Sequence, residues 1–186
     1  MIIIGLSGYK GVGKTSAADY LVRYRGFKKL SFSTRLKELS RILIPEFTET
    51  MLFGNEKEVS QSFITDHTPR EFMERLGEFM RFWRNTYWLD IIKNGVENNH
   101  NFNIVIDDVR YPNEAEYLRK LDGILVRVNR YKSKNPYSFD PNSPSEISLD
   151  KFEFDHTVEE YENISLLDLY KAVDRVLVET QQHGKS

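Results

Sequence analysis

The chain has 186 residues with a formal net charge of −2, and 40% of its residues are hydrophobic. This length and composition suit one compact domain with a hydrophobic core. The balanced charge argues against sequence-wide binding to nucleic acid, because proteins that bind it usually carry a basic excess. No cysteine is present and the four histidines are scattered, which excludes disulfides and thiol catalysis and leaves oxygen ligands for any metal.

No run approaches the roughly 18 apolar residues that a membrane helix needs. Residues 1–6 lack the basic region and the cleavage site of a signal peptide. We therefore expect a cytoplasmic protein that binds small charged molecules and neither membranes nor nucleic acid. The sequence leaves open whether the chain forms a homodimer.

The first part of the chain alternates between strand and helix patterns. Residues 1–7 are apolar and rich in β-formers, and residues 14–25 carry apolar side chains at helical spacing. Residues 27–32 predict a second strand, and residues 34–43 predict a helix that a following proline ends.

A strong helix start follows a weakly patterned segment. Residues 46–66 predict a loop with a short helix around Met51. Thr68 as N-cap, a proline in the first turn and a glutamate three residues after the cap predict a helix that runs to about Trp83. Its apolar stripe, expected to face the core, is Phe72, Leu76, Phe79 and Trp83. The other stripe, a candidate ligand face, is Arg70, Glu74, Gly77, Arg81 and Arg84. A second helix should hold Trp88, Leu89, Ile91 and Ile92.

The rest of the chain continues the alternation. Residues 103–108 predict a buried strand that becomes acidic at its end, and Pro112 opens a helix through Leu121. The remaining predicted elements are a strand at 123–128, a loop at 131–145, a short strand at 157–158 and a terminal helix capped by residues 165–168. Strands that alternate with helices predict an α/β fold, with a parallel sheet flanked by helices in a single domain, 1–186.

Residues 8–15 match the pattern G-x-x-x-x-G-K-[ST] between a predicted strand and a predicted helix. Glycines let such a loop bring its N–H groups onto phosphate oxygens at the positive end of a helix. Lys14 would place a charge on the β- and γ-phosphates, and Thr15 or Ser16 would bind Mg²⁺. The motif predicts ATP or GTP with Mg²⁺ but leaves the acceptor open. The candidate ATP-binding residues are Gly8, Gly11, Val12, Gly13, Lys14, Thr15 and Ser16.

Two acidic residues follow the buried strand, as in a Walker B motif. Parallel α/β sheets bind ligands at the carboxyl ends of their strands. We expect Asp108 to hold Mg²⁺, partly through water. The alternative is that Asp107 and Asp108 only end the strand and cap a turn.

At this point the sequence resembles a known family, the deoxynucleoside monophosphate kinases of tailed bacteriophages and some bacteria. The similarity covers residues 8–15, 68–71 and 76–77, the run Asp-Val-Arg-Tyr-Pro-Asn-Glu-Ala-Glu at 108–116, the Ser-Glu pair at 145–146, and 155–169. The run at 108–116 is the most specific of these. Many members have aspartate where Thr15 stands, so the choice between Thr15 and Ser16 as metal ligand stays open.

The resemblance implies a nucleoside monophosphate kinase-like fold of the P-loop NTPase type. It implies transfer of the ATP γ-phosphoryl group to a deoxynucleoside monophosphate, giving the diphosphate for DNA synthesis. Residues 46–100 would form a helical acceptor-binding insertion, and residues 129–146 would form a lid loop.

Two arginines are candidates for the acceptor phosphate. Arg70 lies in the first turn of its helix, where the helix dipole and a guanidinium fork both favour a phosphate. Arg110 follows the acidic strand end, and its planar donors suit the acceptor α-phosphate. We assign catalytic roles to Lys14, Asp108, Arg110 and Arg130.

Basic residues cluster before and within the predicted lid. Arg127 begins this cluster, and Arg130, Lys132 and Lys134 could close over ATP, with a solvated basic loop as the alternative. Glu146 and Asp155 follow the loop, and they either pair with it or bind the sugar or base.

Aromatic and acidic side chains near these segments have two interpretations each. The nucleobase could stack on an aromatic residue of the set Phe82, Trp83, Tyr87 and Trp88, of which Trp83 is our candidate, although such residues are more often core. We interpret Glu114 and Glu116 as charges of a helix first turn.

Other functions compete with this one. Dephospho-CoA kinase, or another small P-loop metabolite kinase, would share the phosphate loop, but the block at 108–116 argues against it. A nucleotide-dependent switch is a different class, and no Asn-Lys-x-Asp motif for guanine occurs. An inactive P-loop scaffold would be expected to lose Lys14 or the neighbouring hydroxyl, and both are present.

Overall fold

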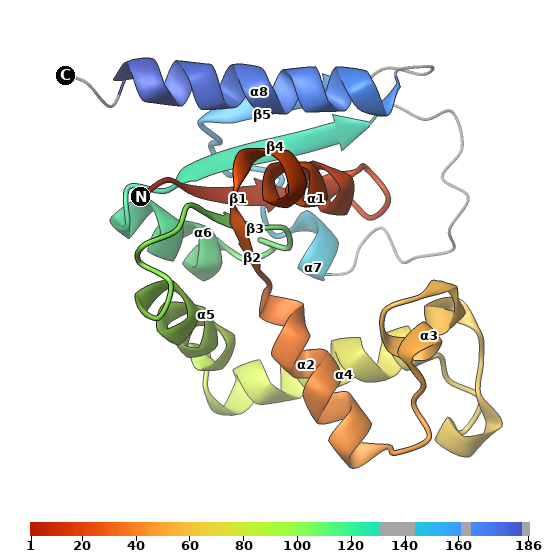
Figure 1. Cartoon of the computed structure of the whole chain (residues 1–186). Coiled ribbons are helices and arrows are strands. Elements are labelled where there is room, and N and C mark those ends of the chain that lie inside the picture. The colour runs from red at the N-terminus through yellow and green to blue at the C-terminus, as the bar shows by residue number, and fades with distance from the viewer. Residues whose placement is uncertain (131–143, 161–164, 184–186) are drawn as a thin grey trace. The chain divides into compact units, whose positions relative to one another are not determined.

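The computed structural model describes residues 1–130, 144–160 and 165–183. The chain divides into two compact units (Figure 1). Unit 1 consists of Met1–Ser31 and Gly95–Ser186, and unit 2 is Phe32–Asn94. The second unit overlaps the insertion predicted at 46–100 but begins earlier.

Unit 1 contains a five-stranded sheet in the order β2-β3-β1-β4-β5. All four neighbouring pairs are parallel. The central strand β1 is paired with β3 through Ile4 and Val105 and with β4 through Ile4 and Ile124. The strands are β1 Ile3–Ser7, β2 Lys28–Leu30, β3 Ile104–Ile106, β4 Ile124–Arg130 and β5 His156–Glu160. The predicted parallel α/β fold is confirmed.

Helices cover both faces of the sheet in unit 1 (Figure 1). Strand β1 is buried along its whole length, as expected for a parallel strand with helices on both sides. On one face it packs with α1 Lys14–Arg25 and α8 Leu166–His183, in a core that includes Ile4, Leu6, Ala17, Leu21, Val126, Leu169 and Val173. On the other face, a Cβ added at Gly5 would lie 2.6 Å from Leu118 of α6 Pro112–Lys120. Helices therefore pack closely against both faces of the sheet.

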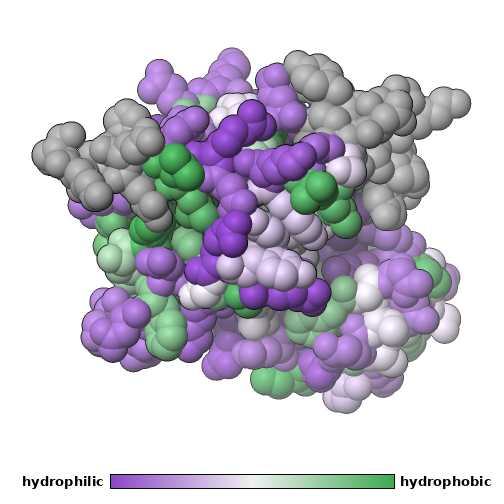
Figure 2. All heavy atoms as spheres, turned by 45° about the horizontal axis from the view of Figure 1, so that its top comes forward, coloured by the Kyte–Doolittle hydropathy of each residue, from purple (hydrophilic) through white to green (hydrophobic). Residues whose placement is uncertain are grey.

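The outward side of α8 faces solvent. Hydrophilic side chains gather over this helix in Figure 2, and the exposed charged residues on it include Asp168, Lys171, Arg175 and Glu179. Ser165 and Asp168 form the predicted cap, since the amide and hydroxyl of Ser165 donate to Asp168 at 3.1 and 2.7 Å. Helix α8 therefore covers one face of the sheet and packs its apolar side against it.

Unit 2 is helical. Its elements are α2 Phe32–Leu43, α3 Glu49–Leu52, the 3₁₀ turns η1 Asn55–Glu58 and η2 Ser62–Ile64, α4 Pro69–Trp83 and the beginning of α5 Tyr87–Glu97. Thr68 and Glu71 form the predicted capping box at the start of α4. Helix α2 begins two residues before its predicted start, and the preceding strand β2 is shorter than the strand predicted at 27–32. Among the described residues no helix is long and apolar enough to cross a membrane.

The predicted buried face of α4 is confirmed only at its beginning, where Phe72 packs against the core cluster of unit 2 and Leu76 is half-buried, and it is wrong at Phe79 and Trp83. Pro69, Met73 and Gly77 are buried, whereas Phe79 and Trp83 are 58% and 71% exposed. Met73 packs in a cluster with Phe47, Leu52 and Ile64, which come from segments without helical periodicity. Gly77 accepts a hydrogen bond from Trp88 Nε1 at 3.1 Å, so Trp88 belongs to the core of unit 2.

The two faces of α4 can be compared directly by truncation. Met73→Ala should lower the free energy of unfolding by about 2–4 kcal/mol, because it removes a buried side chain and leaves a cavity. Phe79→Ala, at an exposed position, should change it by less than about 1 kcal/mol. Urea unfolding followed by circular dichroism measures both. If Phe79→Ala lowers the free energy of unfolding more than Met73→Ala does, the buried face predicted from the sequence is correct.

Candidate active site

The phosphate loop lies between β1 and α1. Gly8 and Gly11 have positive φ values of 141° and 80°, in the region that favours glycine. A Cβ added at Gly8 would lie 2.2 Å from the carbonyl oxygen of Val128 on β4. Val12 is buried in the core of unit 1. The loop is therefore fixed from both sides, by the close approach of Gly8 to β4 and by the Val12 side chain.

The loop ends at the N-terminus of α1. Gly13 is the N-cap, with a φ of 105° and no side-chain cap, and the first turn of α1 contains no acidic residue. The first N–H groups of a helix lack partners within the helix and favour an anion. This end of α1 fits a phosphate group, which would supply the missing acceptors.

Lys14 is buried in the loop that it belongs to. Its Nζ donates to the carbonyl oxygens of Gly8 and Tyr9 at 2.6 and 2.8 Å. Burial and the Arg110 guanidinium lower the pKa of Lys14 to about 7, while Glu146, Asp107 and Asp108 act in the opposite direction. The nearby carboxylates do not fully compensate the burial of Lys14 and the charge of Arg110. A bound phosphate would supply the negative charge that favours the charged form of Lys14.

Two carboxylates follow β3, at the same edge of the sheet as the phosphate loop. Thr15 Oγ1 donates to Asp107 Oδ2 at 3.3 Å, and the Lys29 ammonium lies 2.8 Å from the same oxygen. Asp108 accepts a hydrogen bond from Ser31 Oγ at 2.6 Å. The carboxylate that meets the P-loop hydroxyl is therefore Asp107, and the assignment of Mg²⁺ to Asp108 stays a prediction.

Magnesium prefers oxygen ligands and keeps several waters. Thr15 and Asp107 offer a hydroxyl and a carboxylate oxygen that fit such an ion, and Ser16, the other candidate, is half-buried in the first turn of α1. Within the described part of the chain, no group of three or more histidine, cysteine, aspartate or glutamate side chains could hold a metal. Magnesium would therefore depend on waters and on the nucleotide phosphates for the rest of its ligands.

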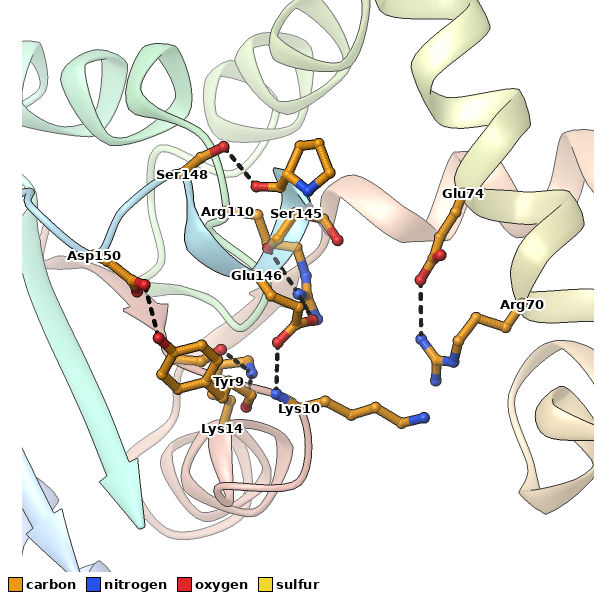
Figure 3. A network of polar contacts seen from close by, with 12 residues as sticks. Tyr9, Lys10, Lys14, Arg70, Glu74, Arg110, Ser145, Glu146, Ser148 and Asp150 are labelled. Carbon is orange, nitrogen blue, oxygen red and sulfur yellow. Dashed lines mark hydrogen bonds and ion pairs between the residues drawn. The ribbon is translucent and has the colours of Figure 1, made fainter. Parts of the chain in front are cut away.

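Arg110 is held by two buried glutamates. Glu114 Oε2 accepts hydrogen bonds from the amides of Arg110 and Tyr111 at 2.8 and 3.1 Å, in the capping box of α6. Arg110 Nη1 forms an ion pair with Glu146 and donates to the carbonyl oxygen of Ser145 at 3.0 Å (Figure 3). The prediction of a helix first-turn charge is confirmed for Glu114, whereas Glu116 lies beyond the first turn of α6.

Residues after 143 contact the phosphate loop. Short helix α7 Pro144–Ile147 carries Glu146, whose Oε2 accepts the Lys10 amide at 2.9 Å. The Tyr9 hydroxyl donates to Asp150 at 2.7 Å (Figure 3), and Asp150 also pairs with Arg127 at 2.8 Å. Sequence reasoning missed the contribution of Asp150, because nothing near it in the chain marks it as a partner of the loop.

Arg127 does not belong to a lid. It is 8% exposed on β4, and its guanidinium lies over the rings of Tyr9 and Phe154. The sequence groups Arg127 with the basic residues that follow it, because the spacing of charges along a chain does not show which strands pair. Arg130 ends β4, but its side chain lies outside the described residues, as do Lys132, Lys134 and most of the lid predicted at 129–146.

Arg70 lies in unit 2, in the first turn of α4. Its Nε forms an ion pair with Glu58, and its Nη1 lies 3.9 Å from Glu74 Oε1. Trp83 ends the same helix and is exposed, with Phe79 and Phe82 packed edge-on against its ring. The sequence gave no sign of Glu58 as the partner of Arg70. Both candidates keep their proposed roles as predictions.

Comparisons with known proteins agree on the fold. The structure resembles shikimate kinase from Aquifex aeolicus with a TM-score of 0.55 at 13% identity, covering 100% of this chain and 99% of that one. It resembles TT1252 from Thermus thermophilus with a TM-score of 0.54 at 17% identity, covering 96% and 97%. Dephospho-CoA kinase from Campylobacter jejuni gives a TM-score of 0.50 at 12% identity, covering 95% and 96%. No protein-family model matches the chain.

One relative is closer in sequence. The chain is 31% identical over 169 residues to a candidate deoxynucleotide monophosphate kinase of Acanthamoeba polyphaga mimivirus, a match that covers 80% of this chain and 82% of that protein. The fold and the phosphate loop define a small P-loop kinase. The chain belongs to the deoxynucleotide monophosphate kinase family.

The lowered pKa of Lys14 predicts that nucleotide binding takes up a proton. Phosphate groups beside Lys14 favour its charged form and should raise its pKa towards the ordinary value of about 10.4. Between these two pKa values the complex holds a proton that the free protein lacks. At about pH 8.5, ATP binding should take up about one proton, and the affinity should fall as the pH rises.

Titration calorimetry in two buffers with different ionisation enthalpies measures this uptake. Lys14→Arg is the matched control, because arginine keeps its proton throughout this range. The variant should bind ATP without proton uptake. The same uptake in both proteins would contradict the assignment to Lys14.

Proposed function

We propose that this protein transfers the γ-phosphoryl group of ATP to a deoxynucleoside monophosphate and releases the diphosphate. The observation that carries the proposal is that two cations lie near one edge of the sheet. Lys14 belongs to the phosphate loop, and Glu146 holds Arg110 close to this loop. One cation suits the donor phosphates and the other suits the acceptor phosphate. The relationship to the mimivirus protein supports the choice of a deoxynucleotide as acceptor.

Each group would act on charge that develops during transfer. The N–H groups of residues 11–15 and the Lys14 ammonium would hold the β- and γ-phosphates of ATP. Magnesium, bound near Thr15 and Asp107, would neutralise charge on the phosphate oxygens. Arg110 would hold the acceptor phosphate so that its oxygen faces the γ-phosphorus.

Arg110 has donors left for this task. Among the described residues, its Nε and Nη2 have no hydrogen-bond partner, while Nη1 is occupied by Glu146 and Ser145. The unpaired donors are on two nitrogens of one planar group, which suits two oxygens of a single phosphate. The guanidinium can therefore bind an acceptor without releasing Glu146.

ADP release in the presence of ATP and Mg²⁺ tests the function. The panel consists of deoxynucleoside monophosphates, the matching ribonucleotides and dephospho-CoA, with a reaction that contains no acceptor. Turnover should require a nucleoside monophosphate, disappear with a chelator and return with Mg²⁺. Turnover only with dephospho-CoA, or equally without any acceptor, would refute the proposal.

Lys14 should be needed for turnover and not for folding. Lys14→Ala should lower kcat by roughly 10²–10⁴-fold, because phosphoryl transfer relies on electrostatic stabilisation. Circular dichroism should show the wild-type helix content. A folded variant with a near-normal rate would contradict the role of Lys14.

Arg110 should serve the acceptor more than ATP. Arg110→Lys keeps the charge but loses the planar donors, so kcat/KM for the acceptor should fall by roughly 10- to 200-fold. Arg70→Ala should act in the same direction. Acceptor kinetics and direct ATP binding, measured on both variants, separate the two sites. A collapse of ATP affinity with unchanged acceptor constants would assign these arginines to the donor.

A further inference from the structure

Glu146 is a buried carboxylate with two partners far apart in the sequence. The residue is 9% exposed, and its side chain is 7% exposed. One oxygen accepts the Lys10 amide of the phosphate loop at 2.9 Å, and the other pairs with Arg110 Nη1. These partners lie 136 and 36 residues away from it in the chain. A carboxylate is buried at a substantial cost unless its charge is matched, so its position depends on both contacts.

Glu146 bridges the Lys10 amide and the Arg110 side chain, and this bridge fixes one end of the guanidinium. Glu114 holds the backbone of Arg110, and Glu146 holds Nη1 of its side chain. The guanidinium is planar and rigid, so fixing one nitrogen also sets the direction of the others. Figure 3 shows Glu146 between the guanidinium of Arg110 and the loop at Lys10.

The charge of Glu146 also acts on two nearby cations. Arg110 lowers the pKa of Lys14 and Glu146 raises it, so all three charges act on one another. Burial alone would lower the pKa of Arg110, yet this pKa is raised, because Glu146 opposes burial through its charge and its hydrogen bond. Without this carboxylate, the repulsion between Arg110 and Lys14 would be less opposed, and the Ser145 carbonyl would be the remaining acceptor that holds Nη1 among the described residues.

We infer that Glu146 is a positioning residue: its carboxylate holds the Arg110 guanidinium against the phosphate loop and directs the free donors towards the acceptor phosphate. This inference rests on the proposed function of Arg110. It replaces the earlier alternatives for Glu146, in which this side chain binds the sugar or the base. Glu146 touches no substrate in this role and acts through Arg110.

The kinetic test compares charge with size at this position. Glu146→Gln keeps the size of the side chain and removes its charge, and it should lower kcat/KM for the acceptor by roughly 10- to 100-fold. Glu146→Asp keeps the charge and should lower it less. ATP affinity should change by less than about threefold in both variants. Glu116→Gln, at an exposed position on α6, is the matched control and should behave as wild type.

A double variant shows whether Glu146 acts through Arg110. In the Arg110→Lys background, adding Glu146→Gln should cost at most about threefold more, because the fork that it orients is already absent. Multiplied effects would overturn the positioning role. Greater activity for the glutamine variant than for the aspartate variant would also overturn it, since size and not charge would then matter.

A spectroscopic measurement separates this inference from the proposed function. In protein labelled with ¹⁵N-arginine, the Arg110 Nε–H resonance, assigned by its loss in Arg110→Lys, should move towards the position of free arginine in Glu146→Gln and stay in place in Glu116→Gln. An unmoved resonance in Glu146→Gln overturns the inference. If it moves as expected but the wild-type protein phosphorylates no nucleotide, the proposed function fails and the anchoring of Arg110 by Glu146 stands.

Discussion

The parallel alignment of the strands in unit 1 gathers the charged groups of the site. Strands β1, β2 and β3 run in the same direction, so the residues after them, Gly8, Ser31 and Asp107, emerge at one edge of the sheet. This edge accepts the phosphate loop only because Gly8 has no side chain, since a Cβ there would lie 2.2 Å from the Val128 carbonyl oxygen. One close backbone contact thus sets the place of the loop, and through it the place of Lys14.

Around this loop, two cations and three buried carboxylates lie close to one another. Lys14 and Arg110 are the cations, and Asp107, Glu114 and Glu146 are the buried carboxylates of unit 1 that lie beside them. Removing one member of such a group costs more than the whole group contributes, because it leaves an uncompensated buried charge. The arrangement keeps two like charges close together before any phosphate arrives. A site organised in this way needs little rearrangement when it binds an anion.

Signals that depend on a few neighbouring residues were readable in the sequence. The phosphate loop, the capping box at Thr68 and the helix start at Pro112 all lie where they were predicted, because their contacts fall within one turn of chain. The buried face of α4 was readable only in part. Phe79 and Trp83 repeat at helical spacing as core residues do, but the cluster of Phe47, Leu52 and Ile64 packs on Met73 and Phe72 and leaves these two aromatic residues exposed.

The sequence by itself determined the class of fold and the chemistry of the phosphate loop, since strand and helix periodicity and the glycine, lysine and threonine positions are local properties. Tertiary structure alone decided which charges meet. Asp107 rather than Asp108 faces Thr15, because successive side chains after a strand point to opposite sides. Glu146 joins Lys10 to Arg110 because α7 packs beside the loop. Charge pairing between distant segments depends on packing, and no spacing along the chain records it.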